Sequence, residues 1–417
     1  MRHVVVMVTT SYPRFAGDHV GTFMEPIAKR VAARGHDVHI VAPWHPLISR
    51  GGPEDGVSFH FFKYAPVPAL NVFGYAAGMR ADEALRGSAW LAAPFAMASG
   101  WFKAMRVAQK RGATVMHGHW VVPGGVIAAI ARPALPLVVS LHGSDVFVAE
   151  RTVAARAAAR RVLARSGAVT ACSQDLADRA IALGADAGRV EVVPYGVDPA
   201  RFRPWTQADR AALRQRAGIP AGGPLVAAAG RLVRKKGFEY LIDALPHAGA
   251  NVHLVIAGSG DLAAELSARA RSGPAADRIH FVGNVSQDAV GEWFASADVV
   301  AVPSVHDQTG NVDGLPNTLL EGLASGTPVV TTRAGGIGSI VEPDRSAIIV
   351  PEKDSRALGD AIAALIADAD RRSRLGREGR ALVERQFGWT RRQRDSKRRT
   401  IAPLPSSHSP ANIYGIQ

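Results

Sequence analysis

The chain has 417 residues, of which 47% are apolar and 20% are charged, a composition typical of a globular protein and not of a disordered one. A chain of this length does not usually fold around a single hydrophobic core, so two or three domains are expected. The 49 Lys and Arg residues outnumber the 36 Asp and Glu residues, which gives a formal charge of +13. This excess favours polyanionic partners: nucleic acid, an anionic membrane surface or phosphorylated substrates.

Cysteine usage and apolar patterning indicate the compartment. The single cysteine, Cys172, excludes an internal disulfide framework, and no secretory signal precedes the strand-like start HVVVMVT. The longest apolar run, residues 89–102, is interrupted by Pro94 and Gly100 and is shorter than the ~20 helical residues that span a bilayer. We therefore expect a cytoplasmic protein that, if it meets a membrane, lies peripherally on its inner face.

The first forty residues read as a βαβ unit, with strands at 3–9 and 36–42 around a helix at 22–34. The loop SYPRFAGDHVG after the first strand carries Gly17, which could let the backbone approach a ligand. No GxGxxG follows this strand, and the second strand ends in Ala42-Pro43-Trp44 without an acid. The sequence therefore disfavours a nicotinamide-dependent enzyme.

Aromatic residues gather at 59–102, which holds ten of the chain's 27 aromatics, Tyr64 and Trp101 among them. From Arg86 to Arg111 there are five basic residues and no acid. This pattern suits a membrane-interface or lipid-acceptor surface, in which Tyr64 and Trp101 would be candidate acceptor contacts. A packed core with a solvated basic face explains it equally well.

Two histidine groups follow the next strands. The strand at 113–116 ends in His117-Gly118-His119-Trp120, and the strand at 136–141 ends in His142-Gly143-Ser144-Asp145. Carboxyl ends of strands are where α/β folds bind ligands, so His142 is a candidate active-site residue, although a hydrogen-bonded loop histidine is equally compatible. A zinc site from His117, His119 and His142 is disfavoured because two of these histidines share one short turn without a cysteine or carboxylate partner. An Ala/Arg-rich stretch at 149–165 is interpreted as one helix whose arginines lie on a solvent-exposed face.

A linker, PYGVDPARFRPW, precedes a second α/β series. Its strands are expected at 225–230, 252–257, 279–282 and 299–302. We expect an α/β protein with two Rossmann-like domains, residues 1–196 and 197–389, facing each other across a cleft. Residues 390–417 contain six basic residues and one acid and are predicted to be a mostly disordered tail.

Residues 303–332 contain the most informative helix. Pro316 suits its first position and Gly326 the position just past its end. The N-terminus of such a helix is a ready anion site, with Asp313 just before it and Glu321 one turn inside. For two acids alone, a turn residue and a solvated helix residue remain the simpler interpretation.

Two cations could complete this anion site. Arg231 offers a bidentate fork and Lys236 a point charge, which together suit a diphosphate, although each alone is more often a surface charge. The turns at Gly258 and Gly283 expose backbone that could hold a nucleobase. The sequence contains no Gly-Lys-Ser/Thr loop and no Gly-x-Ser-x-Gly elbow, so it gives no motif for P-loop phosphoryl transfer or acyl transfer.

At this point the chain resembles the retaining, nucleotide-sugar-dependent glycosyltransferases of the GT-B fold, family 4 (glycosyl transferases group 1). The resemblance runs from residue 1 to about residue 389 and rests on SYPRFAGDHVGTF, the HGSD turn, VPYGVD, GRLVRKKG and DGLPNTLLEGLASGTPVV. The last two motifs at this separation are highly specific.

The resemblance implies a role for each matching residue. Arg231 and Lys236 would bind the diphosphate of a UDP- or GDP-sugar, Glu321 its ribose and Asp313 the sugar hydroxyls. His142 would lie by the anomeric centre and Gly17 against the phosphates. The remaining donor contacts implied are Gly258, Gly283, Gly314, Leu315, Pro316 and Asn317, and the weaker acceptor contacts are His119, Tyr64 and Trp101.

The resemblance also implies the reaction. It is sugar transfer with retention, without a metal or prosthetic group, to a hydroxyl acceptor that the aromatic and basic residues suggest is lipid-linked or part of a cell-envelope glycan. The chain departs from the family in having Asp313 where Glu is usual, and in its tail. A sugar-nucleotide epimerase, a glycan phosphorylase and a non-catalytic nucleotide-sugar binding protein are the alternatives. Nucleic acid is disfavoured because no recognition motif accompanies the charge.

Overall fold

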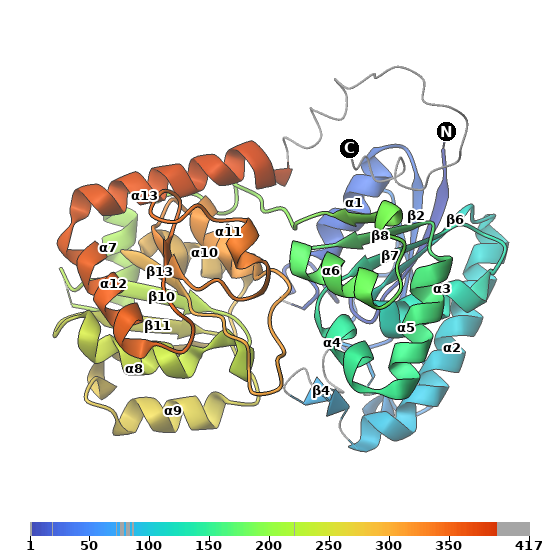
Figure 1. The fold of residues 1–417 in the computed structure, drawn as a ribbon, viewed down its shortest axis with the longest axis horizontal. Helices are drawn as coiled ribbons and strands as arrows, with labels where there is room; N and C mark the ends of the chain where they lie inside the picture. Colours follow the sequence, from blue (N-terminus) through green and yellow to red (C-terminus); the bar gives the residue numbers. More distant parts are fainter. Residues whose placement is uncertain are drawn as a thin grey trace. The chain divides into compact units, whose positions relative to one another are not determined.

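The computed structural model describes residues 2–18, 20–71, 73–75, 79–80, 84–85, 87–220 and 222–389. The chain divides between Pro194 and Tyr195 into two compact units, called unit 1 and unit 2 below (Figure 1). The predicted boundary lies two residues later, after residue 196. The predicted tail, residues 390–417, lies outside the described residues.

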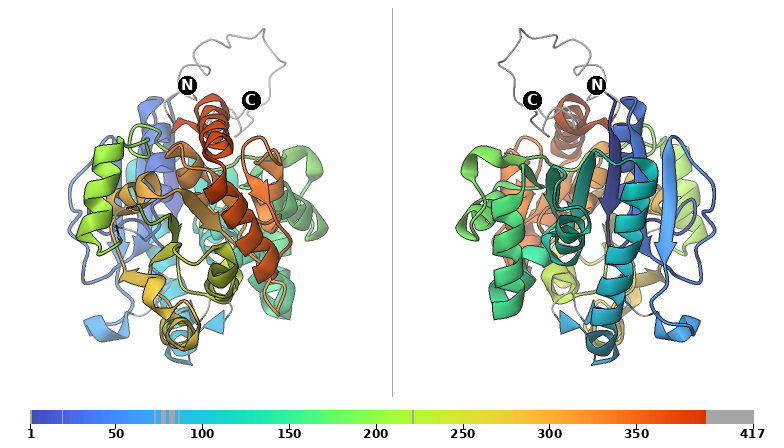
Figure 2. Two further views of the ribbon diagram at one scale, coloured as in Figure 1. Left: turned by 90° about the vertical axis from the view of Figure 1, so that its left-hand side faces the viewer. Right: turned by 90° about the vertical axis from the view of Figure 1, so that its right-hand side faces the viewer.

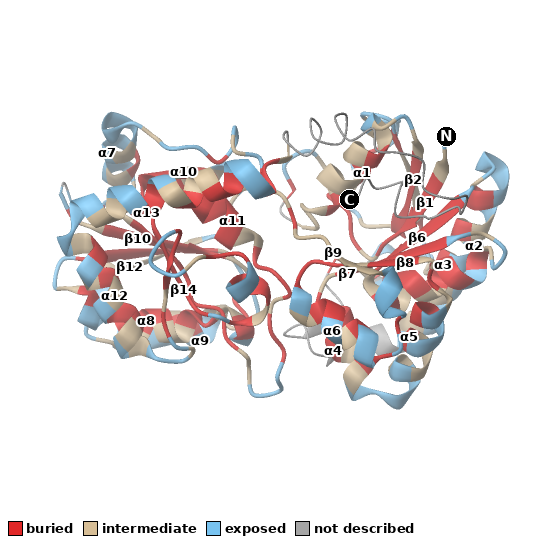
Figure 3. Cartoon of the chain, turned by 45° about the horizontal axis from the view of Figure 1, so that its top comes forward, coloured by how far each residue is buried: buried red, intermediate tan, exposed pale blue. Residues whose placement is uncertain are grey.

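Unit 1 contains a parallel sheet in the order β3-β2-β1-β6-β7-β8-β9. Consecutive residues of its central strand, Val5 to Met7, are all 0% exposed, so helices cover both faces of the sheet (Figure 3). The strands are β1 (Val4–Val8), β2 (Asp37–Pro43), β3 (Val57–Phe62), β6 (Val115–His119), β7 (Leu137–Leu141), β8 (Ala168–Ala171) and β9 (Val190–Val192). Two short antiparallel strands, β4 (Met79–Arg80) and β5 (Ala84–Leu85), lie apart from it.

The helices of unit 1 confirm the βαβ prediction and correct one detail. They are α1 (Met24–Ala33), α2 (Gly87–Arg111), α3 (Val126–Ala131), α4 (Ser144–Arg151), α5 (Val153–Arg165) and α6 (Gln174–Ala182), with short turns η1 (Pro68–Leu70), η2 (Trp120–Gly125) and η3 (Ala187–Arg189). The stretch 149–165, predicted as one helix, is divided at Thr152, whose hydroxyl caps α5 by accepting from the Ala155 amide.

Helix α2 runs along the outside of unit 1 and passes through Pro94 and Gly100 without a break (Figure 2). Pro94 lies on the exposed side of the helix. Gly100 lies where an added Cβ would come within 3.0 Å of Phe62 and 3.1 Å of Ile127, so it allows close packing against β3 and α3. No helix in the described part of the chain combines the length and apolarity needed to cross a membrane.

Unit 2 repeats the design with a parallel sheet in the order β12-β11-β10-β13-β14-β15. Its strands are β10 (Leu225–Ala229), β11 (His253–Ala257), β12 (Ile279–Gly283), β13 (Val299–Val302), β14 (Val329–Thr331) and β15 (Ile348–Ile349). Its helices are α7 (Gln207–Arg216), α8 (Phe238–Ala248), α9 (Ala263–Ser272), α10 (Gln287–Ser296), α11 (Asn317–Ala324), α12 (Ser355–Ala367) and α13 (Ala369–Leu382). The short turns are η4 (Arg234–Lys236), η5 (Ala276–Arg278), η6 (Gly335–Ser339) and η7 (Val383–Phe387).

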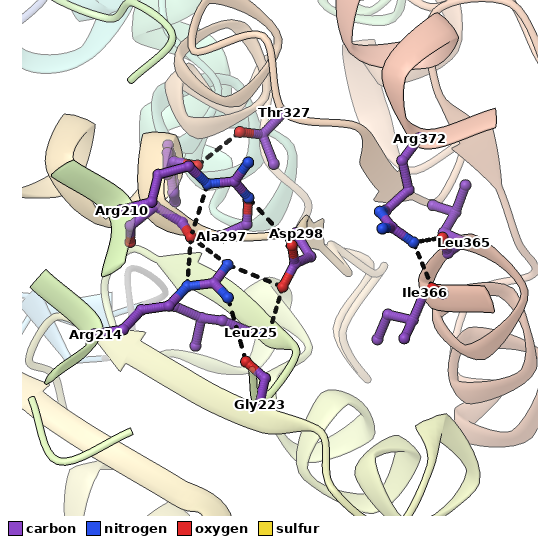
Figure 4. Close-up of polar contacts among 12 residues, drawn as sticks. Arg210, Arg214, Gly223, Leu225, Ala297, Asp298, Thr327, Leu365, Ile366 and Arg372 are labelled. Carbon is purple, nitrogen blue, oxygen red and sulfur yellow. Dashed lines mark hydrogen bonds and ion pairs between the residues drawn. The ribbon is translucent and has the colours of Figure 1, made fainter. Parts of the chain in front are cut away.

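Helix α7 is fastened to the sheet by a carboxylate, not by a broad apolar face. Asp298, just before β13, lies 3.1 Å from the Arg210 guanidinium and 2.9 Å from that of Arg214 (Figure 4). The same carboxylate accepts from the Leu225 amide at the start of β10, at 2.8 Å. These largely buried ion pairs hold α7, the first helix of unit 2, against the sheet. Removing the carboxylate would leave two guanidinium groups without a counter-charge.

In both sheets the strand order reverses beside the first strand. The reversal lies between β1 and β6 in unit 1 and between β10 and β13 in unit 2. The loops that leave neighbouring strands diverge at such a point, and α/β folds bind ligands there. His119 ends β6, Arg231 follows β10 and Asp313 follows β13, so the sequence-predicted site residues lie on these loops.

The loops of unit 2 interlock through close backbone contacts at the reversal point. Gly237, at φ +65°, lies where an added Cβ would be 2.0 Å from the Pro303 carbonyl oxygen. The Val305 amide donates to the Lys235 carbonyl at 2.9 Å, which joins the same two loops. The turn carrying Lys236 is thus held against the loop that leads to Asp313.

We expect Gly237→Ala to destabilise unit 2 by more than about 3 kcal/mol, because a left-handed alanine costs about 1–2 kcal/mol and the clash adds to it. Gly218→Ala is the matched control, since Gly218 has φ +72° with nothing within 4 Å of the added Cβ. The control should cost only the conformational part. Urea unfolding followed by tryptophan fluorescence measures both, and equal losses would show that the two loops are not tightly packed.

Candidate active site

Helix α11 positions the centre of the site in unit 2. It runs from Asn317 to Ala324, and Gly326 just beyond its end has φ +70°, as the sequence predicted. Pro316 is the residue before the helix, not its first residue, because its ψ of 120° is extended. No side chain of the described residues caps this end by a hydrogen bond, so the first amides keep their capacity to bind an anion.

The carboxylate of Asp313 lies between two lysines just before this helix end. Its Oδ1 is 3.3 Å from the Nζ atom of Lys235, and its Oδ2 is 2.6 Å from that of Lys236. Burial alone would raise the pKa of Asp313, but the two ammonium groups outweigh burial and hold the pKa well below its usual range. The cluster therefore consists of an ionised carboxylate held between two ammonium groups.

Three predicted residues lie around this cluster. Lys236 is half-buried and bonded to Asp313, whereas Arg231 is exposed on the turn that follows β10. Gly314 lies beside a second supporting loop, because its carbonyl accepts from the Gly336 amide at 2.9 Å. Of the predicted backbone contacts at the helix end, Leu315 and Pro316 are buried and Asn317 is half-buried.

Glu321 lies on the same helix and is 7% exposed. Burial raises the pKa of its carboxyl group to about 7, although the Gln287 amide and the charges of Lys236 and Arg201 oppose the rise. Gln287, on α10, donates to Oε1 of Glu321 at 3.1 Å. A carboxylate held in this way has a second oxygen that can accept from a diol.

Gly258 and Gly283, predicted to border a nucleobase, take different positions. Gly258, at φ +144°, packs so closely that an added Cβ would be 1.9 Å from the Gly230 carbonyl oxygen. It therefore allows the turns after β10 and β11 to touch. Gly283, at φ +68°, has open space at its Cβ position and is exposed at the end of β12.

Sequence reasoning missed three residues of this region: Lys235, Gln287 and Asn311. The amide of Asn311 is 1% exposed, and neither of its polar atoms has a hydrogen-bond partner. Unpaired buried polar groups are rare in proteins and call for an explanation, and a hydroxyl-rich ligand would supply partners. Lys235 stands in the quoted motif GRLVRKKG, but the sequence alone does not show that two adjacent lysines share one acid.

In unit 1, His142 follows β7 and packs among aromatic rings. The centroid of its ring lies 4.8 Å from that of Phe23 and 4.7 Å from that of Trp120. Burial, with a smaller contribution from His119, lowers the pKa of His142 well below its usual value. His142 is therefore neutral at physiological pH and acts as a hydrogen-bonding group, not as a cation.

The backbone of the His142 loop is held by one buried carboxylate. Asp145, 2% exposed, accepts from the amides of Val121 at 2.7 Å, His142 at 3.3 Å and Gly143 at 3.0 Å. Gly143 has φ 117°, a conformation that glycine adopts readily. Asp145 thus joins the loops after β6 and β7.

Gly17 lies in the loop after β1, and an ion pair between Arg14 and Asp18 shapes that loop. Arg14 is bonded to Asp18 at 2.6 Å, and the Arg14 amide also donates to Asp18 at 2.8 Å. Gly17 is exposed, has φ +84° and has open space at its Cβ position. An approaching anion would thus meet backbone without a side chain in the way.

The three predicted acceptor residues of unit 1 are not brought together. His119 is 0% exposed and lies behind His142, with its Nδ1 atom 3.1 Å from Nε2 of His142. The hydroxyl of Tyr64 is bonded by the Phe73 amide, which closes the loop after β3. Trp101 lies on the outer face of α2, where its ring nitrogen donates to the Ile130 carbonyl at 3.3 Å. His119 thus contacts His142, and not the surface.

No group of three or more His, Cys, Asp or Glu residues within the described ranges is arranged to hold a metal ion. Unit 2 brings together paired charges, a helix end and a buried carboxyl. Unit 1 holds a neutral histidine on a glycine turn.

Comparison with known families decides the identity. Residues 209–382 match the family described as Glycosyl transferases group 1, and residues 20–196 match the Glycosyl transferase 4-like domain. A GDP-mannose-dependent alpha-(1-6)-phosphatidylinositol monomannoside mannosyltransferase of Mycolicibacterium smegmatis is 32% identical over 276 residues, which cover 65% of this chain and 72% of that protein.

The chain belongs to the group 1 glycosyltransferases.

Other relatives agree with this membership. The mannosyltransferase of the same description from Mycobacterium tuberculosis is 29% identical over 392 residues, covering 92% of this chain and 94% of that protein. A D-inositol 3-phosphate glycosyltransferase of Xylanimonas cellulosilytica is 39% identical over 237 residues, but the match spans only 55% of each chain. Thus the chain spans about half the length of that relative.

Solved structures confirm the two-domain GT-B fold of this glycosyltransferase. The protein HepE of Anabaena, crystallised in complex with UDP, has a TM-score of 0.74 at 20% identity, covering 95% of this chain and 100% of that one. WaaG, a glycosyltransferase involved in lipopolysaccharide biosynthesis, has a TM-score of 0.67 at 17% identity, covering 96% and 100%. At these identities the likeness shows the fold alone.

The raised pKa of Glu321 makes the stability of this glycosyltransferase depend on pH. The carboxyl is ordinary in the unfolded chain but titrates at about 7 when folded, so ionising it opposes folding between about pH 4.5 and 7. We expect Glu321→Gln to stabilise the protein above pH 7 by up to the order of 3 kcal/mol and to give no gain below about pH 4.5. Melting temperature against pH measures this.

Glu384→Gln serves as the control, because the side chain of Glu384 is 49% exposed. Its melting temperature should follow that of the wild type across the same pH range. A Glu321→Gln gain that is independent of pH would contradict the assigned titration.

Proposed function

We propose that this glycosyltransferase moves a sugar, with retention and without a metal ion, from a nucleoside diphosphate sugar to a hydroxyl acceptor. The observation that carries the proposal is the Lys235–Asp313–Lys236 cluster at the open N-terminus of α11, with Glu321 one turn inside that helix. Cations and helix amides suit a diphosphate, and a buried carboxylate suits a ribose diol.

In this proposal the cluster stabilises the leaving group. The bond from the anomeric carbon to the diphosphate oxygen breaks, and Lys236, Arg231 and the amides of α11 neutralise the charge that develops there. Asp313 holds Lys236 in place and faces the sugar hydroxyls. The acceptor oxygen bonds to the anomeric carbon on the same face, and its proton passes to the departing phosphate oxygen. Positioning and electrostatics supply most of the rate.

His142 and Gly17 are assigned to the sugar side of the reaction. A neutral imidazole beside the anomeric centre exchanges hydrogen bonds with sugar hydroxyls without placing a second cation there. Gly17 leaves space for the phosphates at the end of β1. Both residues lie in unit 1, whereas the cations lie in unit 2.

The donor is proposed to be a UDP- or GDP-sugar and the acceptor a lipid-linked or cell-envelope glycan. The mycobacterial relatives are described as GDP-mannose-dependent enzymes that act on a phosphatidylinositol monomannoside, which supports a hydroxyl acceptor carried on a lipid. Such an acceptor lies at a membrane, so the enzyme would work from the cytoplasmic side against an anionic surface.

Slow donor hydrolysis, measured without acceptor on UDP-, GDP- and ADP-sugars, separates this proposal from its alternatives. Release of the sugar with its anomeric configuration retained is the expected outcome. Formation of an epimer would identify a sugar-nucleotide epimerase, and saturable binding without chemistry would identify a binding protein. Addition of a chelator should leave the rate unchanged.

Lys236→Ala tests the assigned leaving-group contact. We expect kcat for donor hydrolysis to fall about 10²- to 10³-fold, the usual cost of removing one charge-stabilising donor. Arg234→Ala is the matched control, because Arg234 lies in the same turn but pairs with Glu265, on α9, at 2.9 Å. It should change the rate less than about threefold. Equal rates for Lys236→Ala and wild type would refute the assignment.

A further inference from the structure

Helix α2 has an exposed apolar face that the proposed catalysis does not use. Leu91 is 78% exposed, Phe95 66% and Phe102 49%, and their spacing places them on one side of the helix. Trp101, 38% exposed, borders this face, and Ile130 of α3 extends it with 51% exposure. Scattered surface apolar residues are normal, but a contiguous row of large ones marks an interaction site.

The second half of the same helix is basic. Lys103, Arg106, Lys110 and Arg111 follow the apolar residues, and no acid occurs from residue 87 to residue 111. Arg106 lies over the ring of Phe102, with its guanidinium carbon 5.5 Å from the centroid. The apolar part and the basic part of the helix surface therefore adjoin at Phe102.

A groove of about 730 Å³ runs between α2 and the edge strand β3. Its lining includes five cations and, among the described residues that line it, no carboxylate: Lys63, Lys103, Arg106, Lys110 and Arg111. His60 shows the effect of this environment, because burial, neighbouring His39 and three of these cations lower its pKa to about 4. A volume of this size with unopposed cations suits a phosphate headgroup.

We infer that the exposed face of α2 and this groove dock unit 1 on an anionic phospholipid bilayer, with Leu91, Phe95 and Phe102 entering the interface and the groove holding lipid phosphates. An apolar stripe beside bare basic residues is the pattern of helices that lie in the plane of a membrane. A protein partner would not require an acid-free groove, and nucleic acid, which stacks its bases on aromatic rings, would not use the exposed Leu91 side chain.

The docking surface is separate from the proposed catalytic site. The groove lies along α2 and β3 at the sheet edge, whereas His142 and Gly17 follow the central strands β7 and β1. Binding to vesicles requires neither donor nor acceptor. Vesicle binding can therefore fail while transfer succeeds, or the reverse.

Flotation of the full chain with vesicles tests the inference. Wild type should bind vesicles of phosphatidylcholine with phosphatidylglycerol, and not phosphatidylcholine alone, with binding that weakens in salt. The triple variant Lys103→Gln, Arg106→Gln, Lys110→Gln should bind about a hundredfold more weakly, since each charge near an anionic surface contributes about fivefold. Phe95→Ser with Phe102→Ser should also lose binding.

Helix α5 offers matched controls on the same unit. Arg160→Gln with Arg161→Gln removes two exposed charges, and Val153→Ser removes an apolar side chain that is 85% exposed. These variants should bind like wild type, and circular dichroism should show every variant folded. Wild-type binding by either α2 variant would overturn the inference. At matched ionic strength, displacement from vesicles by inorganic phosphate, which would indicate a free-phosphate site, or by duplex DNA would also overturn the inference.

A second inference concerns His119, which the proposed mechanism does not place. Its ring lies between two others: the Nδ1 atom of His119 is 3.1 Å from Nε2 of His142, and its ring centroid is 3.9 Å from that of His117. Its own Nε2 atom is buried and has no hydrogen-bond partner. Burial lowers the pKa of His119 to about 3, so its ring carries a single proton.

The unpartnered nitrogen determines where that proton resides. A buried N–H without an acceptor is rarer and costlier than a buried lone pair without a donor. The proton of His119 therefore lies on Nδ1 and is donated to Nε2 of His142. His142 must then carry its own proton on Nδ1.

We propose that His119 is a positioning residue that fixes the tautomer of His142, with the proton of His142 on Nδ1. This rests on the proposed function only for the role of His142 near the sugar. The tautomer itself is a property of the protein without substrate.

Nitrogen-15 NMR of histidine-labelled protein reads the tautomer directly, with His142→Gln used to assign the signal. We expect Nδ1–H on His142 in wild type and in His119→Asn, whose side-chain amide can donate from a similar position. His119→Phe should shift His142 towards Nε2–H and lower kcat for donor hydrolysis about tenfold, with activity restored in His119→Asn.

The pair of His253 with His280, at 3.2 Å in unit 2, provides a control. His280→Phe removes a similar pair in the other unit and should change neither the tautomer of His142 nor the rate of donor hydrolysis. A His142 signal that is the same in His119→Phe and wild type would overturn the inference, whatever the activity. An altered tautomer without activity in any protein would instead refute the proposed function.

Discussion

The ion cluster of Asp313 with Lys235 and Lys236 is the interaction on which the rest of unit 2 depends. A largely buried carboxylate is costly unless it is paired, and here two ammonium groups within 3.3 Å keep it ionised. The cluster joins the turn after β10 to the loop after β13, the two loops that diverge where the strand order reverses. It leaves one net positive charge beside the uncapped end of α11. An anion-binding surface therefore follows from the same contacts that hold the loops together.

Glu321, on α11, is also buried, but its pKa shifts in the opposite direction to that of Asp313. The hydrogen bond that it accepts from Gln287 is too weak to offset burial, so the pKa of Glu321 rises to about 7, whereas that of Asp313 falls. A group that titrates near neutrality is one whose charge a ligand can set, because a diol donating to the carboxylate favours the ionised form. The two acids at one helix end are thus suited to different tasks: Asp313 orients lysines permanently, and Glu321 responds to what binds.

The sequence predicted the parts of this arrangement that local chemistry dictates. Apolar runs indicated the parallel strands, Gly326 the end of α11, and the βαβ order the two similar units. The failures came from tertiary packing. The stretch 149–165, predicted as one helix, breaks at Thr152 because the Thr152 hydroxyl caps a new helix. Lys235 and Gln287 were missed because their partners, Asp313 and Glu321, lie 78 and 34 residues away in the chain.

The distribution of basic residues gives the net charge of +13 a specific meaning. In unit 2 the arginines of α7 are bonded to Asp298, and Arg278 and Arg380 donate to backbone carbonyls, so these cations serve the fold. Along α2 the cations follow one another without an acid and line a groove beside exposed phenylalanines. Charge that no internal acid balances, next to apolar surface, is matched by a bilayer, which offers phosphate and hydrocarbon at adjacent depths. In the inferred docking on a bilayer, these cations account for part of the excess charge without a nucleic-acid partner.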